Sequence, residues 1–207
     1  MSDAETPEVR AEIIAICQEH LARLGEEAGR VAEDRLATLA SKTAADTAAL
    51  LDQIAASTRR IRAAGDAAAV LVELADSVGQ LCDRAVVLLN DGDRLTGFRA
   101  SGGESPAEAT DLRQVSFDLA SAPALAHAVE TKDSMVITGG QHNVSHQLAT
   151  KLGYSDDTQL RAVPLVLRDT VLGLVLVDGA AVRESAIESL ILTAEAWIEA
   201  LNSRPKT

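Results

Sequence analysis

The stretch LRAVPLVLRDTVLGLVLVDG, Leu160 to Gly179, decides the fold of this chain. It holds two apolar runs, Ala162–Leu167 and Val171–Val177, with only three polar residues between them. This spacing predicts a β-hairpin whose turn is formed by Arg168 to Thr170. The second run lacks any alternation of polar and apolar residues, so it predicts a central strand that is buried on both faces. The stretch therefore indicates a sheet with a packed layer on each side.

The residues before and after this hairpin predict the remaining elements of one α+β domain. Strands are predicted at Arg84–Asn90, Arg94–Ala100, Val115–Asp118 and Ser134–Gly139, and helices at Asp66–Cys82, Ser121–Thr131, Val144–Leu152 and Ser185–Asn202. Asp66 is a favourable N-cap for the first of these helices. The sequence Ser185-Ala-Ile-Glu188 matches a capping box, so it predicts the start of the last helix.

A helical region precedes this domain. Pro7 suits the first turn of a helix, whereas Gly25 and Gly29 weaken the helix that follows. Residues Arg30–Ala64 contain neither glycine nor proline and could form one helix of about 50 Å. The alternative is a break at Ser41 to Thr43. Its apolar stripe is too narrow to form a core by itself, so we expect this helix to need a partner.

Composition excludes several classes of function. Hydrophobic residues make up 47% of the 207 residues, which is enough for a sizeable core, but aromatic residues make up only 2%. The net charge of −12 disfavours nucleic acids and anionic membrane surfaces as partners. Cys17 and Cys82 form no CxxC pair, which favours a reducing compartment. With no signal-peptide pattern and no long apolar run, we expect a cytoplasmic protein.

Three stretches together resemble a GAF domain. They are VLVELADSVGQLCDRAVVLLNDGDRLTGFRA, APALAHAVETKDSMVI and RAVPLVLRDTVLGLVLVDG. The likeness extends from about Gly65 to Asn202, which divides the chain into an N-terminal helical and dimerisation region, 1–64, and a GAF-like domain, 65–203. It implies a central antiparallel sheet with helices on one face and ligand-capping loops and short helices on the other.

The resemblance also says which ligands to look for. GAF domains that bind cyclic nucleotides carry an Asn-Lys…Phe-Asp-Glu constellation that this sequence lacks. Bilin-binding GAF domains need a cysteine in the pocket region, and GAF enzymes that reduce methionine sulfoxide need several cysteines, whereas Cys82 is alone in this domain. We therefore expect no cofactor and no catalytic residues, and we leave the identity of any small-molecule ligand open.

Six residues are candidates for ligand binding. They are Arg99, Ser116, His127, His142, His146 and Arg161. The two arginines lie on or beside strands and could be counter-ions for an anionic ligand, or could face water. Ser116 precedes Phe117 on a strand, so only one of them can face a pocket, and Phe117 suits the core.

The histidines have competing interpretations. His142 and His146, at positions i and i+4, could share a helix face and hold a metal. The absence of an acidic or cysteine ligand nearby and the preceding Gly139-Gly140 favour a solvated loop instead, so we expect no metal site. His127 could be a proximal haem ligand or a packing residue. Trp197, at the shoulder of the last helix, suits helix–helix packing better than ligand stacking.

Three functional hypotheses follow. The first is a non-enzymatic GAF-like signalling or regulatory module that binds a small molecule or a protein partner. The second is a structural scaffold whose pocket is filled with side chains, and the third is a small-molecule enzyme. In the first two, residues 30–64 and the last helix are expected to form a bundle or coiled coil across the two-fold axis of a homodimer.

Overall fold

The computed structural model describes residues 5–102, 112–138, 152, 154, 158–178 and 183–204, with the backbone alone at 5–22, 24, 25, 28 and 138. The chain divides into two compact units, Met1–Asp52 and Gln53–Thr207. The second unit takes in the last turns of the first helix, which the sequence analysis had assigned to the N-terminal region. The predicted helix at 144–152 lies mostly outside the described residues.

The helix α1 is continuous from Glu5 to Ala63. Neither the predicted weakening at Gly25 and Gly29 nor the alternative break at Ser41 interrupts it. A glycine inside a helix is unfavourable by only about 1 kcal/mol, and the flanking alanine, leucine, glutamate and arginine residues are all good helix formers. Their summed propensity therefore carries the helix through both glycines.

The second unit contains a six-stranded antiparallel sheet. In chain order the strands are β1 (Arg84–Asn90), β2 (Arg94–Gly102), β3 (Ser116–Asp118), β4 (Met135–Thr138), β5 (Gln159–Leu167) and β6 (Thr170–Asp178). Their order across the sheet is β3-β2-β1-β6-β5-β4. Every pair is antiparallel, as the resemblance implied.

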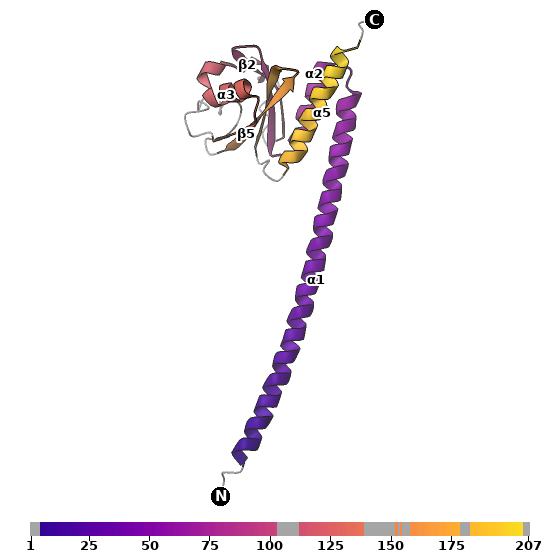
Figure 1. The fold of residues 1–207 in the computed structure, drawn as a ribbon, viewed down its shortest axis with the longest axis vertical. Helices are drawn as coiled ribbons and strands as arrows, with labels where there is room; N and C mark the ends of the chain where they lie inside the picture. Colours follow the sequence, from indigo (N-terminus) through magenta and orange to yellow (C-terminus); the bar gives the residue numbers. More distant parts are fainter. Residues whose placement is uncertain are drawn as a thin grey trace. The chain divides into compact units, whose positions relative to one another are not determined.

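Helices cover both faces of this sheet (Figure 1). The helices α2 (Ala67–Gly79) and α5 (Glu184–Asn202) lie on one face, where α2 packs against β1 and β2 and α5 packs against β5. The helix α3 (Pro123–Thr131) lies on the other face, together with the short 3₁₀ helix η1 (Leu112–Gln114). We call the face that α2 and α5 cover the helix face, and the opposite face the α3 face. A second 3₁₀ turn, η2, spans Leu119–Ser121.

The predicted hairpin is formed by β5 and β6. The strand β6 lies between β1 and β5, and its residues from Gly173 to Val177 are all buried. The prediction of a central strand buried on both faces is confirmed. The turn at Arg168 and Asp169 is exposed, and Arg168 has the positive φ of 56° that a two-residue hairpin turn requires.

The central strands approach each other closely at Gly173. A Cβ atom at this position would lie 2.1 Å from the carbonyl oxygen of Leu88 on β1. That distance is far inside van der Waals contact, so no other residue fits here without a shift of the backbone. Glycine is therefore required at this position of β6, beside β1.

The two predicted helix caps have different outcomes. The Asp66 carboxylate accepts the backbone N–H of Ala69 at 2.8 Å, so the predicted N-cap is confirmed. The predicted capping box at Ser185 is wrong, because α5 begins one residue earlier and Arg183 is its N-cap without a side-chain hydrogen bond. Glu184 and Glu188 instead form ion pairs with Arg161.

Candidate functional site

The α3 face carries a large apolar cluster of the core. The resemblance to GAF domains implies that any small-molecule ligand would bind on this face. The buried residues of this cluster are Val86, Leu88, Leu95, Leu112, Ala122, Ala124, Leu125, Ala128, Ile137, Leu152, Tyr154, Leu160, Ala162, Val171, Leu174 and Leu176. Leu125 from α3 and Leu112 from η1 contribute side chains that are almost fully buried. Among the described residues, this face is therefore closely packed with aliphatic side chains.

A polar group interrupts the apolar surface at one end of this face. Arg84, at the start of β1, is 8% exposed and is the only buried charged residue in the described part of the chain. Its guanidinium carbon lies 5.4 Å from the centre of the Tyr154 ring. Asp178, at the end of β6, lies next to Arg84 because Ala85 pairs with Val177 in the ladder. A cation, an aromatic ring and a carboxylate thus meet beside the core.

Burial dominates the electrostatics of this polar group. Desolvation raises the pKa of Asp178, while the backbone N–H of Arg84 and its positive charge partly oppose the rise. Burial also raises the pKa of Tyr154 far above its usual value, so its hydroxyl remains protonated and donates to the Leu176 carbonyl oxygen at 3.5 Å. These groups are suited to binding by charge and hydrogen bonding. They offer no activated nucleophile.

The two arginines predicted to contact a ligand lie on the helix face. The Nε and Nη2 atoms of Arg99 each donate to one oxygen of the Asp76 carboxylate on α2, both at 2.8 Å. Arg161 is paired with Glu184 and, at 3.9 Å, with Glu188 on α5. Each guanidinium therefore connects a strand to the helix above it. The role in ligand binding stays a prediction.

The other predicted residues are dispersed. Ser116 lies on the edge strand β3 opposite Thr96, while its neighbour Phe117 packs against the apolar cluster as expected. His127 is exposed on α3, so its interpretation as a packing residue is wrong. His142 and His146 lie outside the described residues. The structure therefore brings none of the described candidates together.

Sequence reasoning missed Arg84, Tyr154 and Asp178. A signal was present, because Arg84 begins one predicted strand and Asp178 directly follows the apolar run Val171–Val177. In an antiparallel pair such residues lie opposite each other when the two strands are in register. Recognising them required knowing that β1 pairs with β6, two strands that lie far apart in the sequence.

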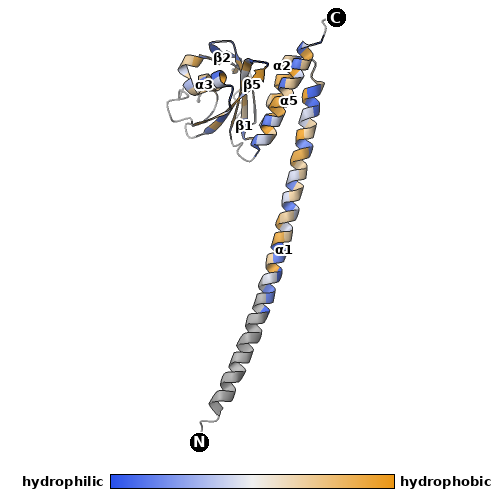
Figure 2. Ribbon diagram, in the orientation of Figure 1, coloured by the Kyte–Doolittle hydropathy of each residue, from blue (hydrophilic) through white to orange (hydrophobic). Residues whose placement is uncertain are grey.

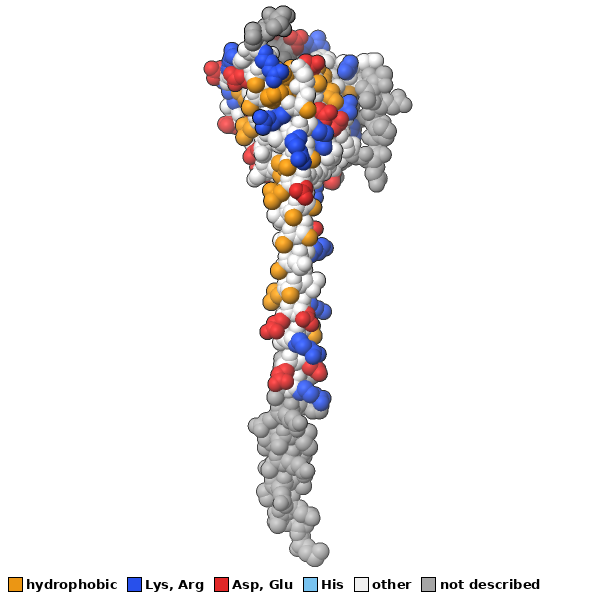
Figure 3. Space-filling view, turned by 90° about the vertical axis from the view of Figure 1, so that its right-hand side faces the viewer, with side chains coloured by type: hydrophobic (Ala, Val, Ile, Leu, Met, Phe, Trp, Pro, Cys, Tyr) orange, Lys and Arg blue, Asp and Glu red, His pale blue; other side chains and the backbone are white. Residues whose placement is uncertain are grey.

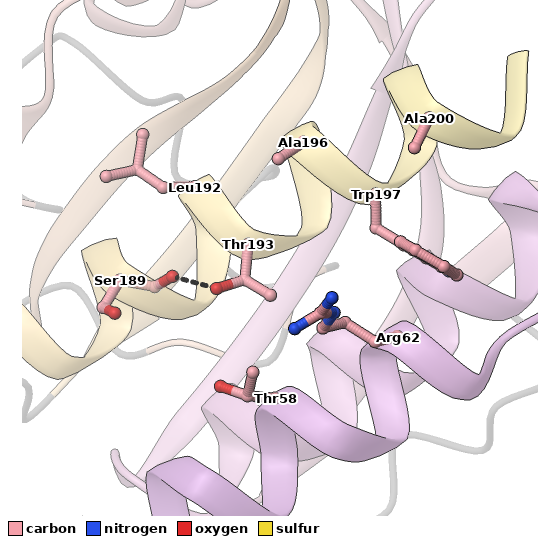
Figure 4. A pocket seen from close by; sticks show the side chains of 8 residues that line it. All are labelled: Thr58, Arg62, Ser189, Leu192, Thr193, Ala196, Trp197 and Ala200. Carbon is pink, nitrogen blue, oxygen red and sulfur yellow. Dashed lines mark hydrogen bonds between the residues drawn. The ribbon is translucent and has the colours of Figure 1, made fainter. Parts of the chain in front are cut away.

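A second feature is a groove on the outer side of the helix layer (Figure 4). It has a volume of about 560 Å³ and runs between the last turns of α1 and the outer surface of α5. Its lining residues are Thr58, Arg62, Ser189, Leu192, Thr193, Ala196, Trp197 and Ala200. Small side chains line most of it, whereas the Leu192 side chain projects at one border with an exposed fraction of 65%.

Trp197 connects the two helices beside this groove. Its indole Nε1 donates to the Ala64 carbonyl oxygen at 3.0 Å, at the end of α1. The guanidinium carbons of Arg62 and Arg204 lie 5.9 and 5.2 Å from the centre of the ring. The predicted helix–helix role of Trp197 is confirmed. The α1 end within the second unit is also fixed by Ile61 and Ser57, which are buried.

The described residues contain no group of three or more histidine, cysteine, aspartate or glutamate side chains placed to hold a metal ion. Cys82 is half-buried, and burial together with Asp178 and Asp83 raises its pKa to about 12. Its thiol donates to the Val78 carbonyl oxygen at 3.1 Å. A thiol in this environment is a poor nucleophile.

Comparison with known proteins identifies the fold. No family model matches the sequence, and no curated protein matches it. Solved structures do match. The GAF domain of a phosphoenolpyruvate-protein phosphotransferase from Coxiella burnetii aligns with a TM-score of 0.59 and 12% identity, over 74% of this chain and 95% of that one.

Two further solved structures agree. The GAF domain of the Acinetobacter phosphoenolpyruvate-protein phosphotransferase has a TM-score of 0.58 and 15% identity, over 75% and 96% of the two chains. A GAF domain/HD domain protein from Geobacter sulfurreducens has a TM-score of 0.56 and 18% identity, over 69% and 98%. The chain therefore has a GAF-like α+β fold, as the sequence stretches predicted.

No helix in the described part of the chain is both long enough and apolar enough to cross a membrane.

Proposed function

We propose that this chain is a non-enzymatic, GAF-like sensory or regulatory module that works as a homodimer and passes its signal to a protein partner. The observation that carries the proposal is the exposed apolar surface of α1. In the first unit, Val31, Leu36, Leu39 and Leu51 are exposed by 49, 66, 60 and 60%. Hydrophobic and charged residues both occur along the described part of α1 (Figures 2 and 3).

One side of α1, which includes Leu36 but not Val31, Leu39 or Leu51, has the spacing of a coiled coil. Leu36, Ala40, Thr43, Thr47 and Leu50 follow one another at alternating intervals of four and three residues, which places them on one side of the helix. A single helix in water gains little stability by itself, and most helices depend on a packed apolar face. A second copy of the same helix supplies that packing.

The threonines on this side of α1 are compatible with such a seam. The Thr43 hydroxyl donates to the Leu39 carbonyl oxygen at 2.9 Å, and the Thr47 hydroxyl donates to the Thr43 carbonyl oxygen at 2.8 Å. Because each hydroxyl has a partner within its own helix, burying the threonine methyl groups leaves no donor unsatisfied.

The groove between the end of α1 and α5 supports a second contact in the same dimer. Leu192 projects at its border, and Ala196 and Ala200 leave room for a side chain. A surface that carries both a projecting side chain and a recess can pair with itself around a two-fold axis. The α5 helices of two copies would then pack with each Leu192 beside the small residues of the other.

The polar group at Arg84 supports the sensory part of the proposal. It provides the charge and hydrogen-bonding groups by which an apolar face selects a small polar molecule. The close packing around Leu125 and Leu112 favours the alternative, a scaffold with no ligand. Native mass spectrometry of the purified chain distinguishes the two, because a retained molecule removed by denaturation supports sensing and a bare chain supports the scaffold.

The dimer is tested by charges in the seam. Leu36→Glu with Thr43→Glu would bury four carboxylates per dimer, which costs several kcal/mol. Ala45→Glu, on the opposite side of the same helix, is the matched control. We avoid Leu50 and Ile54, because both are already half-buried in the single chain.

Sedimentation at micromolar concentration is expected to give a dimer for the wild type and for Ala45→Glu, and a monomer for the double variant. A monomeric wild type, or a double variant that remains dimeric, contradicts the proposal.

A further inference from the structure

The helix face of the sheet is only partly covered. Strands lie about 4.8 Å apart and packed helices about 10 Å apart, so one helix covers about two strands. Six strands therefore offer room for three helices, but α2 packs on β1 and β2 and α5 packs on β5. The outer strand β4 is left beyond α5. Its Val136 side chain, opposite Arg161 on this face, is 52% exposed.

A groove of about 370 Å³ lies between α5 and the edge of the sheet. Val163 and Pro164 of β5 and Ile191 and Leu192 of α5 supply its apolar surface. The polar residues that line it are Lys132, Asp133, Ser134, Glu188 and Glu195. Of its charged residues, three are acidic, and the one basic residue, Lys132, lies 3.7 Å from Asp169.

Glu195 is the most informative of these acids. One of its carboxylate oxygens accepts the backbone N–H of Val166 at 2.6 Å, where β5 is irregular. Burial raises its pKa, and this one hydrogen bond is the only opposing influence. No cation among the described residues is paired with Glu195. A half-buried carboxylate of this kind gains most from a lysine or arginine supplied by an incoming partner.

We propose that this groove, formed by α5 and the β4–β5 edge, binds an amphipathic helix of a partner protein whose apolar side carries lysine or arginine at its margin. The groove beside α5 has an apolar surface, and it is bordered on α5 by Glu195 and by Glu188, which is paired with Arg161. A helix laid beside α5 would cover Val136 and place a basic side chain near Glu195. This groove adjoins the dimer groove, because Leu192 lines both, but its other lining residues on α5 are different ones, and the contact goes beyond the function proposed above.

A second copy of this chain is a poorer occupant. The net charge of −12 makes a generic surface of another copy repulsive toward an acidic groove. A basic partner has the complementary charge, which favours both its encounter and its orientation.

The test uses the full chain and a model peptide. The probe is a fluorescein-labelled peptide of about five helical turns, with leucine on one side and lysine at its margins, and its binding is followed by anisotropy. A peptide with glutamate in place of lysine is the first control. We expect the lysine peptide to bind and to gain helix content by circular dichroism, and the glutamate peptide not to bind.

Two variants locate the binding. Val136→Lys places a repelling charge on the uncovered strip, and Glu195→Gln removes the negative charge but keeps the acceptor for Val166. Their controls are Ala120→Lys, at an exposed position of η2, and Glu130→Gln, at an exposed position of α3. We expect the affinity to fall about tenfold in Val136→Lys and about fivefold in Glu195→Gln, and to be unchanged in both controls.

Each other outcome overturns the proposal. If the lysine peptide does not bind at about 100 μM, the groove has no useful affinity for a basic helix. If the controls lose as much affinity as the variants, only the net charge of the protein attracts the peptide. A bound peptide without helix content means that a strand, not a helix, is the occupant. If the wild type is a dimer and the Val136→Lys variant is a monomer, a second copy of the chain covers the groove.

Discussion

Replacing Gly173 by alanine tests the packing of the central strands. The added methyl carbon would lie 2.1 Å from the Leu88 carbonyl oxygen and 3.3 Å from the Leu89 Cα. Both are backbone atoms of β1, so relief requires a movement of about 1 Å between two paired strands. Overpacking of this kind costs about 1–3 kcal/mol, and a weakened ladder hydrogen bond adds about 1 kcal/mol. The lower entropy of the unfolded alanine chain offsets about 0.4–1 kcal/mol.

The expected net loss in the free energy of unfolding is therefore about 2–3 kcal/mol. For a domain of this size it corresponds to a melting temperature lower by about 5–10 °C. Urea unfolding followed by circular dichroism measures the loss directly. Gly65→Ala is the matched control, because an added Cβ there meets nothing within 4 Å. A change below about 0.5 kcal/mol in Gly173→Ala would refute the close approach of β1 and β6.

Three further predictions concern single groups. In a Cys17→Ser background, Cys82 should react with iodoacetamide at pH 8 far more slowly in the folded protein than in urea, because the pKa of its thiol is raised to about 12. Equal rates would contradict the burial of Cys82. Asp66→Ala should lower the free energy of unfolding by about 1 kcal/mol in urea titrations, since the Ala69 N–H loses its acceptor. Glu195 has a raised pKa, so the folded state binds its proton more tightly than the unfolded state does, and stability falls as pH rises above the usual glutamate range. Glu195→Gln should therefore stabilise the protein at pH 7 but not at pH 4, and a pH-independent effect would exclude this cause.

The fold could be predicted because its elements have strong local signals. The unbroken apolar run from Val171 to Val177 indicated a central strand, and β6 has buried neighbours on both sides. Asp66 fixed the start of α2 through one short-range hydrogen bond. The start of α5 was misplaced because Ser185 has the side chain of a cap, while the competing ion pairs of Glu184 and Glu188 with a distant strand leave no trace in the local sequence.

The candidate site could not be predicted in the same way. Arg99 and Arg161 were selected for their charge, but which face of a sheet a strand residue occupies depends on register and on bulges. A register shift between Val87 and Leu88 affects the strand pair that contains Arg99. The group around Arg84 depends on the pairing of strands from distant parts of the chain, which single-sequence patterns do not report.

That distant pairing has a consequence for how the protein is made. Asn90 of β1 donates through Nδ2 to the carbonyl oxygen of Val171 on β6, 81 residues further along. While the ribosome is still synthesising the stretch between them, β1 has only β2 as a neighbour, and its apolar faces remain open to water. Closing so long a loop is entropically unfavourable and slow, and it must await the emergence of β6. The nascent chain therefore exposes a half-formed sheet with apolar faces until β6 has been synthesised. Chaperones that bind apolar strands are expected to bind it until the hairpin at Arg168 has emerged.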